Sequence, residues 1–97
     1  METLQLIEEL SRKYAVPVDA FLRTGVELAL QERKKSHLRE RLEILSRYGA
    51  ESNDDLENKI RQGIISDHPA WEDLIEIKNI ETEVREIDRD LGLIRAA

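Results

Sequence analysis

Five residues that break or end helices divide this chain, and their spacing constrains its fold more than any other feature. Each interval between them carries apolar residues at the three- and four-residue spacing of an amphipathic helix. No interval shows the alternation of Val, Ile and Thr that is typical of a β-strand. We therefore predict an all-α chain of about four helices, with a long central helix and a long C-terminal helix. The breakers are Pro17, Gly49, Gly63, Pro69 and Gly92, and the predicted helices lie near residues 3–14, 18–47, 53–62 and 68–91.

Local signals predict where these helices begin and end. Thr3 is a candidate N-cap of the first helix, and Asp67 is a candidate N-cap of the last. Gly49 suits the left-handed backbone position that follows a helix C-terminus. Ser52, with an acidic residue three positions later, resembles a capping box and opens the short third helix.

The second helix contains one ambiguous stretch. Residues 31–37 are seven consecutive polar residues, which correspond to two turns of helix. A break near Ser36, with a new helix starting at Leu38, is the alternative to one long helix. We favour the continuous helix, because this stretch contains no strong helix breaker.

Size and composition restrict the classes of function. The 97 residues make a single helical domain, in which we expect residues 1–48 to mediate dimerisation and residues 49–97 to form an acidic part. Cysteine is absent and only two histidines occur, which disfavours thiolate metal sites and histidine cages. We expect no enzyme activity, no metal and no cofactor. With no apolar run long enough to span a bilayer and no basic leader, we expect a cytoplasmic protein without a membrane partner.

Residues 67–73, Asp-His-Pro-Ala-Trp-Glu-Asp, have the most unusual local composition. His68 among carboxylates is a candidate for a metal ligand or an acid–base pair, but a single imidazole lacks the spacing of known metal sites. The start of a helix explains the segment better. In that interpretation Asp67 is the cap, Pro69 lies in the first turn and the Trp71 ring anchors the helix to the core.

The last predicted helix carries an apolar row that needs a partner surface. From Ile77 onward the three- and four-residue spacing matches about two heptads of a coiled-coil seam, which is too short to be stable alone. Leu38, Leu42 and Leu45 form a second row on the central helix. So small a monomer is not expected to cover both rows, and we predict a homodimer. The partner-binding row consists of Trp71, Leu74, Ile77, Ile80, Val84 and Ile87.

Charge is distributed unevenly along the chain. The formal net charge of −6 divides into +1 for residues 1–50 and −7 for residues 51–97. An acidic half suits a basic protein partner. A basic stripe on the central helix is a candidate for nucleic-acid contact, although it lacks the interleaved aromatic residues that bind single strands, and a solvated helix face explains it more simply. The stripe comprises Arg33, Lys34, Lys35, Arg39, Arg41 and Arg47.

Two stretches resemble known proteins. Residues 21–30, Phe-Leu-Arg-Thr-Gly-Val-Glu-Leu-Ala-Leu, resemble the second helix of ribbon-helix-helix DNA-binding proteins. Residues 47–91 resemble the C-terminal part of small prokaryotic antitoxins, through Tyr48-Gly49, then Ser52, Leu56, Ile60 and Gly63, then residues 68–74.

The resemblance implies the antitoxin of a type II toxin–antitoxin pair. Its N-terminal part would dimerise and its acidic C-terminal helices would lie across a toxin, often a ribonuclease. Residues 1–6 are too short and too acidic for the N-terminal strand of a ribbon-helix-helix protein, and this departure puts DNA binding in doubt. The alternative is a homo-oligomeric helical scaffold or adaptor with no toxin partner.

Overall fold

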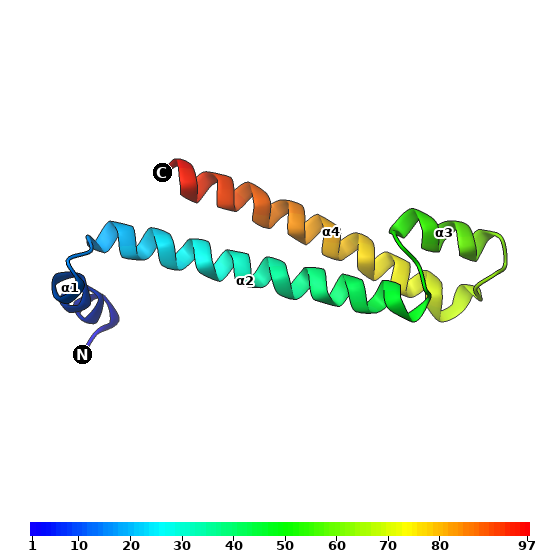
Figure 1. Cartoon of the computed structure of the whole chain (residues 1–97), viewed down its shortest axis with the longest axis horizontal. Coiled ribbons are helices and arrows are strands. Elements are labelled where there is room, and N and C mark those ends of the chain that lie inside the picture. The colour runs from blue at the N-terminus through cyan, green and yellow to red at the C-terminus, as the bar shows by residue number, and fades with distance from the viewer.

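The computed structural model describes residues 1–97 and confirms the all-α prediction. It contains four helices, α1 (Thr3–Tyr14), α2 (Val18–Arg47), α3 (Asn53–Arg61) and α4 (Asp67–Ala96), which include about 84% of the residues and leave no strand (Figure 1). The molecule is a rod of 62 × 27 × 17 Å. None of the four helices combines the length and apolarity that a membrane span requires.

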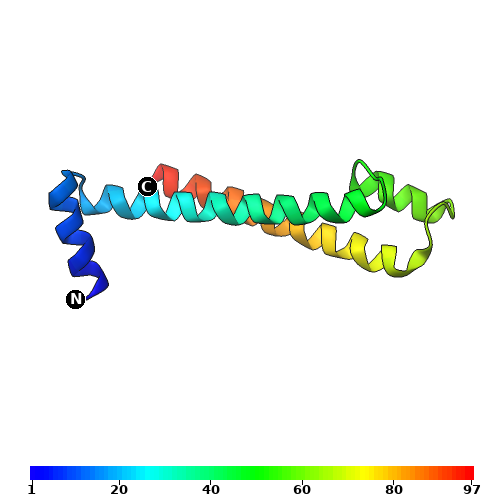
Figure 2. The same ribbon diagram turned by 60° about the horizontal axis from the view of Figure 1, so that its bottom comes forward.

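The two 30-residue helices form an antiparallel hairpin. Helices α2 and α4 lie side by side along the rod, as both views show (Figures 1 and 2). Helix α3 packs against α4 at the end where the hairpin turns, and α1 lies across the opposite end of α2 (Figure 2). Helix α2 is continuous through Ser36, so the alternative of a broken helix is excluded.

The hydrophobic core lies at the α3 end of the rod. Eight buried apolar residues from α2, α3 and α4 make one cluster there, and each is at most 5% exposed. Beyond this cluster, Ile87 and Leu91 extend the buried face of α4 along α2. Helix α1 contains no buried residue. The cluster consists of Ile44, Leu45, Leu56, Ile60, Ala70, Leu74, Ile77 and Ile80.

Glycines end α2 and α3 as the sequence predicts. Gly49 and Gly63 have φ values of 60° and 75°, in the left-handed region that glycine adopts without strain. After Gly49, the N–H of Ala50 donates to the carbonyl of Leu45 at 3.0 Å, which completes a Schellman motif.

The capping interactions of α3 also match the sequence prediction. The Ser52 hydroxyl accepts the N–H of Asp55 at 3.1 Å, and the Asp55 carboxylate accepts the N–H of Glu51 at 2.9 Å. That backbone hydrogen bond, together with Lys59, holds the pKa of Asp55 below its usual value.

Two predicted N-caps are wrong. Helix α1 is capped by Glu2, not Thr3, because the side chain of Gln5 accepts the N–H of Glu2 at 3.3 Å and thereby sets the first turn. In α4, His68 has an extended backbone (φ −116°, ψ 128°), so the uninterrupted helix starts after it and Asp67 does not cap it. A residue that precedes proline is sterically excluded from the helical region, which explains the break.

Two predicted helix ends also shift. Helix α3 ends at Arg61, one residue earlier than predicted, and α4 continues past Gly92 to Ala96. Glycine inside a helix costs about 1 kcal/mol relative to alanine. Contacts with α2 offset that cost, since Leu91 is buried and Arg95 pairs with Glu27 of α2.

Three large apolar residues lie at the surface, and one of them, Trp71, was predicted to anchor the core. Trp71 does not anchor the core, because its side of α4 faces outward and the small Ala70 fills the core position beside it. On α2, Leu45 is buried but Leu38 and Leu42 are exposed. The physical reason is that α4 covers a different face of α2, which carries Lys34 and Arg41.

We expect Leu74→Ala to lower the free energy of unfolding by about 2–5 kcal/mol, because Leu74 is 1% exposed and its truncation leaves a cavity. Leu42→Ala is the matched control on a side chain that is 63% exposed, and its effect should be below about 0.5 kcal/mol. Urea unfolding followed by circular dichroism measures both. Equal destabilisation would contradict this placement of the core.

Candidate protein-interaction surfaces

The predicted partner-binding row of α4 is largely occupied within the chain. Leu74, Ile77, Ile80 and Ile87 are buried, and Val84 packs at the edge of the same cluster. Trp71 is the exception. The expectation that this row is free for another molecule is therefore corrected, since its partner surface is formed by α2 and α3 of the same chain.

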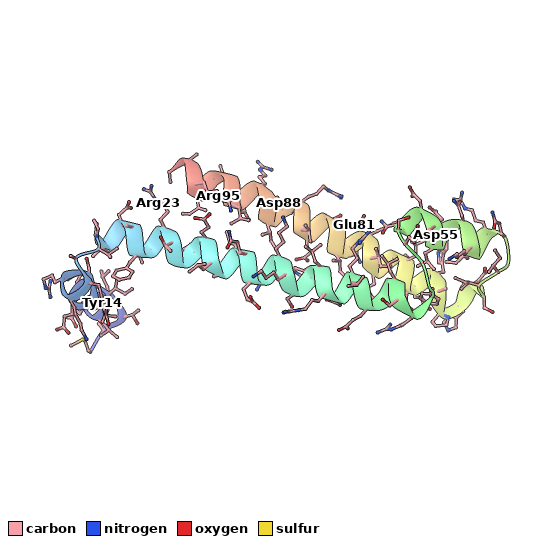
Figure 3. All side chains as sticks on the ribbon, viewed as in Figure 1. Tyr14, Arg23, Asp55, Glu81, Asp88 and Arg95 are labelled. Carbon is pink, nitrogen blue, oxygen red and sulfur yellow. The ribbon has the colours of Figure 1, made fainter.

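Ion pairs close the hairpin beside this buried row. The Lys34 ammonium lies 2.7 Å from the Asp88 carboxylate, and the Arg41 guanidinium lies 3.0 Å from Glu81. Figure 3 shows Glu81 and Asp88 at successive levels of α4. Long basic side chains place their aliphatic stems over apolar neighbours while the charged heads reach acidic partners at the edge. This arrangement explains how a polar face of α2 covers an apolar face of α4.

His37 and Asn53 also make polar contacts with acidic residues of α4. His37 Nε2 lies 3.5 Å from a Glu83 oxygen, and His37 lies between Lys34 and Arg41 along α2. The Asn53 amide nitrogen donates to Glu81 at 2.6 Å, which ties the start of α3 to α4. The contact with Glu83 places His37 at the interface between α2 and α4.

The predicted nucleic-acid stripe does not form one patch. Lys34 and Arg41 face α4 in ion pairs, and Arg39 lies 3.5 Å from Glu32 on α2 itself. Only Arg33 and Lys35 of the six predicted residues have no acidic partner, since Arg47 lies near Asp73 of α4. Phosphate binding needs several unpaired cations on one surface. The structure therefore does not bring the predicted set together.

The segment around His68 fits the helix-start interpretation only in part, because Asp67 is not the cap and Trp71 does not anchor the core. His68 is exposed, and its Nδ1 lies 3.1 Å from a Glu72 oxygen one turn along α4. No group of three or more potential ligands is arranged to hold a metal ion. Nearby, α3 and α4 form an open surface hollow of about 610 Å³, lined by Ile60, Arg61, Asp67, His68, Trp71 and Glu72.

A second hollow lies at the opposite end of the rod and is almost wholly apolar. It measures about 400 Å³ and is formed where α1 crosses α2. No charged or polar side chain lines it, although 37% of the residues in this chain are charged. We call it the N-terminal groove, and its lining residues are Ile7, Leu10, Phe21, Leu22, Gly25, Val26 and Ala29.

The N-terminal groove follows from the turn between α1 and α2. Ala15 adopts the left-handed region at φ 53°, and Pro17 starts α2, so α1 folds back against α2. The apolar faces of both helices are visible in the sequence. Their convergence on one groove is not, because the crossing angle depends on this turn.

Tyr48 connects the end of α2 to α4. Its hydroxyl donates a hydrogen bond to the Asp73 carboxylate, and Arg47 lies 3.9 Å from the same carboxylate. This hydrogen bond, followed by burial and the negative charge of Asp73, raises the pKa of Tyr48 above its ordinary value of 10.0.

A model of the uncharacterized protein MJ0235 family matches residues 1–95, nearly the whole chain, and the chain therefore belongs to this family. No curated protein and no solved structure matches it significantly.

The raised pKa of Tyr48 predicts a loss of stability in alkali. The folded state keeps the phenolic proton to higher pH than the unfolded state, so this contribution is complete below pH 10 and is lost as pH rises through the folded pKa. Thermal unfolding midpoints should fall more steeply above pH 10 for the wild type than for Tyr48→Phe. In Tyr14→Phe, absorbance at 295 nm reports Tyr48 alone, and a midpoint at or below 10 would contradict the assignment.

Proposed function

We propose that this member of the MJ0235 family is a homodimeric helical scaffold that acts by binding proteins in the cytoplasm. The observation that supports it is the N-terminal groove, whose apolar lining has no cover within the chain. Exposed apolar hollows of this kind mark interaction sites in soluble proteins. A groove between crossing helices suits another helical surface, and a second copy supplies one.

The charges around the groove favour a second copy as its occupant. Residues 3–30 contain four acidic and three basic residues, so two identical surfaces meet without strong repulsion. Helix α1 alone is short for a stable helix and has no buried residue in the monomer. Contact with the same surface of a second copy would bury its apolar face.

In such a dimer the hairpins act as rigid arms. The α2–α4 pairs would extend away from a contact made by α1 and the first third of α2, because the core and α3 lie at the far end of the 62 Å rod (Figure 1). Each arm would present its α3 end to other molecules. This division of surfaces is what a scaffold or adaptor requires.

An antitoxin function is the second candidate, and the acidity of the C-terminal half favours it. If α4 bound a toxin through its predicted row, the helix would first have to leave α2. Exposure of Leu74, Ile77, Ile80 and Ile87 would cost about 1.5–3 kcal/mol for each side chain. We rank the scaffold first for this reason. Growth rescue on co-expression with the product of an adjacent gene distinguishes the two functions.

The scaffold proposal predicts a particular pattern of self-association. The 11.3 kDa chain should sediment as a dimer at micromolar concentration. The double variant Leu22→Asp with Val26→Asp places two carboxylates in the interface and should weaken the dimer by at least about 100-fold. Its matched control is Leu38→Asp with Leu42→Asp, which alters exposed leucines of α2 outside the groove and should leave the dimer intact.

Circular dichroism of both variants checks that the helices remain. A wild-type chain that stays monomeric at about 100 µM would refute the proposal, because an interface of this kind should be populated well below that concentration. If only the control variant dissociates, the interface lies instead on the face of α2 that carries Leu38 and Leu42.

A further inference from the structure

We propose that the α3 end of the rod, residues 51–76, binds a positively charged protein segment that inserts an apolar side chain beside Trp71. We call this region the acidic end. It lies at the opposite end of the molecule from the N-terminal groove (Figure 1), so the proposal does not depend on dimerisation.

The acidic end carries the whole net charge of the protein. Residues 51–76 contain eight acidic residues and two of Lys and Arg, for a net charge of −6. The rest of the chain holds thirteen of each sign and is neutral. A net charge gathered at one end of a rod attracts cationic partners to that end and speeds their association.

Several carboxylates of the acidic end have no basic partner. Along the hairpin, Glu81 and Asp88 are neutralised by Arg41 and Lys34 of α2, as described above. By contrast, no ion pair involves four carboxylates of the acidic end, although Asp55, Glu57 and Asp73 have basic neighbours. Carboxylates without an ion pair also occur elsewhere on the rod, but only at the acidic end do they lie within a segment whose net charge is −6. The four are Glu51, Asp54, Asp67 and Glu76.

Apolar groups stand among these charges. Trp71, the only tryptophan, is 45% exposed and lines the hollow between α3 and α4. Ile75, one turn further along α4, is 49% exposed, and Ile64 in the preceding loop is also exposed. Tryptophan is enriched among the residues that dominate interface energetics, and its indole face attracts Lys and Arg.

These features together define the chemistry of the partner. The negative charge selects a basic segment and repels nucleic acid. The hollow of about 610 Å³ has room for one or two apolar side chains. Arg61 also lines the hollow, but its charge is paired with Glu57 at 3.1 Å. The net charge around the hollow therefore stays negative. Apolar contact with Trp71 supplies affinity, and the carboxylates supply rate and selectivity.

Trp71 provides a direct probe of binding. The test uses the full-length protein and a labelled 14-residue amphipathic peptide of Lys and Leu, without Trp or Tyr. Two control peptides have Glu in place of Lys, or Ser in place of Leu. We expect the Lys–Leu peptide to shift Trp71 emission to the blue and to bind at least about 10-fold more tightly than either control. Added salt should weaken the binding.

Variants then locate the site, with peptide anisotropy as the readout. Trp71→Ala should weaken binding about 30-fold, as expected for a hot-spot residue. Glu72→Gln with Glu76→Gln should weaken it about 3- to 10-fold. The matched control, Glu86→Gln with Asp90→Asn, makes the same change in net charge further along α4 and should alter binding less than twofold. If Trp71→Ala does not fold, Ile75→Ala replaces it.

Three results would overturn the proposal. The first is equal binding of the Lys–Leu and Glu–Leu peptides. The second is saturable anisotropy without any change in Trp71 emission, which would place the peptide elsewhere on the rod. The third is equal weakening by the two double variants, since this would show attraction by net charge without a site.

Discussion

The packing of α4 on α2 is the contact on which the rest of the structure depends. It is an asymmetric contact, because α4 contributes a continuous apolar row while the central part of α2 contributes Lys34, His37 and Arg41. The side chains of Lys34 and Arg41 are 34% and 28% exposed, and their charged ends pair with Asp88 and Glu81 at the edge of the row. Buried apolar area supplies most of the stability, and surface ion pairs contribute little each. The pairs serve mainly to fix the register of the two helices.

This asymmetry explains the distribution of charge over the molecule. Lys34 and Arg41 of α2 pair with Asp88 and Glu81 of α4 along the hairpin, and residues 77–97 carry a net charge of only −1, so the acidity of the C-terminal half lies at the α3 end. Helix α2 also extends past the last contact of α4, at the pair between Glu27 and Arg95. Beyond that pair only α1 covers it, which leaves the apolar faces of both helices partly open. The two ends therefore differ in chemistry, one apolar and the other anionic.

In the two proposals, the N-terminal groove and the acidic end have separate binding functions within one small chain. A hairpin with its core at one end tolerates an open surface at the other, because the groove does not stabilise the core. Self-association through the groove and capture of a basic segment at the acidic end would then act independently. Such a molecule links partners through shape and charge.

The sequence by itself determined the secondary structure of this protein. Pro17, Gly49 and Gly63 mark helix ends through backbone sterics, and a three- and four-residue apolar spacing defines helices, so all four helices were predictable, although α4 continues through Gly92. The N-cap residues were less predictable. At the start of α1 the side chain of Gln5 accepts the N–H of Glu2, and the sequence alone does not show that Glu2 is the cap and Thr3 is not.

Only the tertiary structure decided which apolar row is covered and which is open. The α4 row looked unpartnered because the matching face of α2 carries basic residues. An apolar pattern in a sequence counts only apolar residues, so it does not reveal that the aliphatic parts of Lys and Arg side chains can also form a packing surface. Leu38 and Leu42 of the second predicted row stay exposed, because α4 covers a different face of α2. Exposure of Trp71 and convergence of α1 with α2 both follow from helix orientation. That orientation is set by contacts between residues far apart in the chain, which local sequence patterns do not encode.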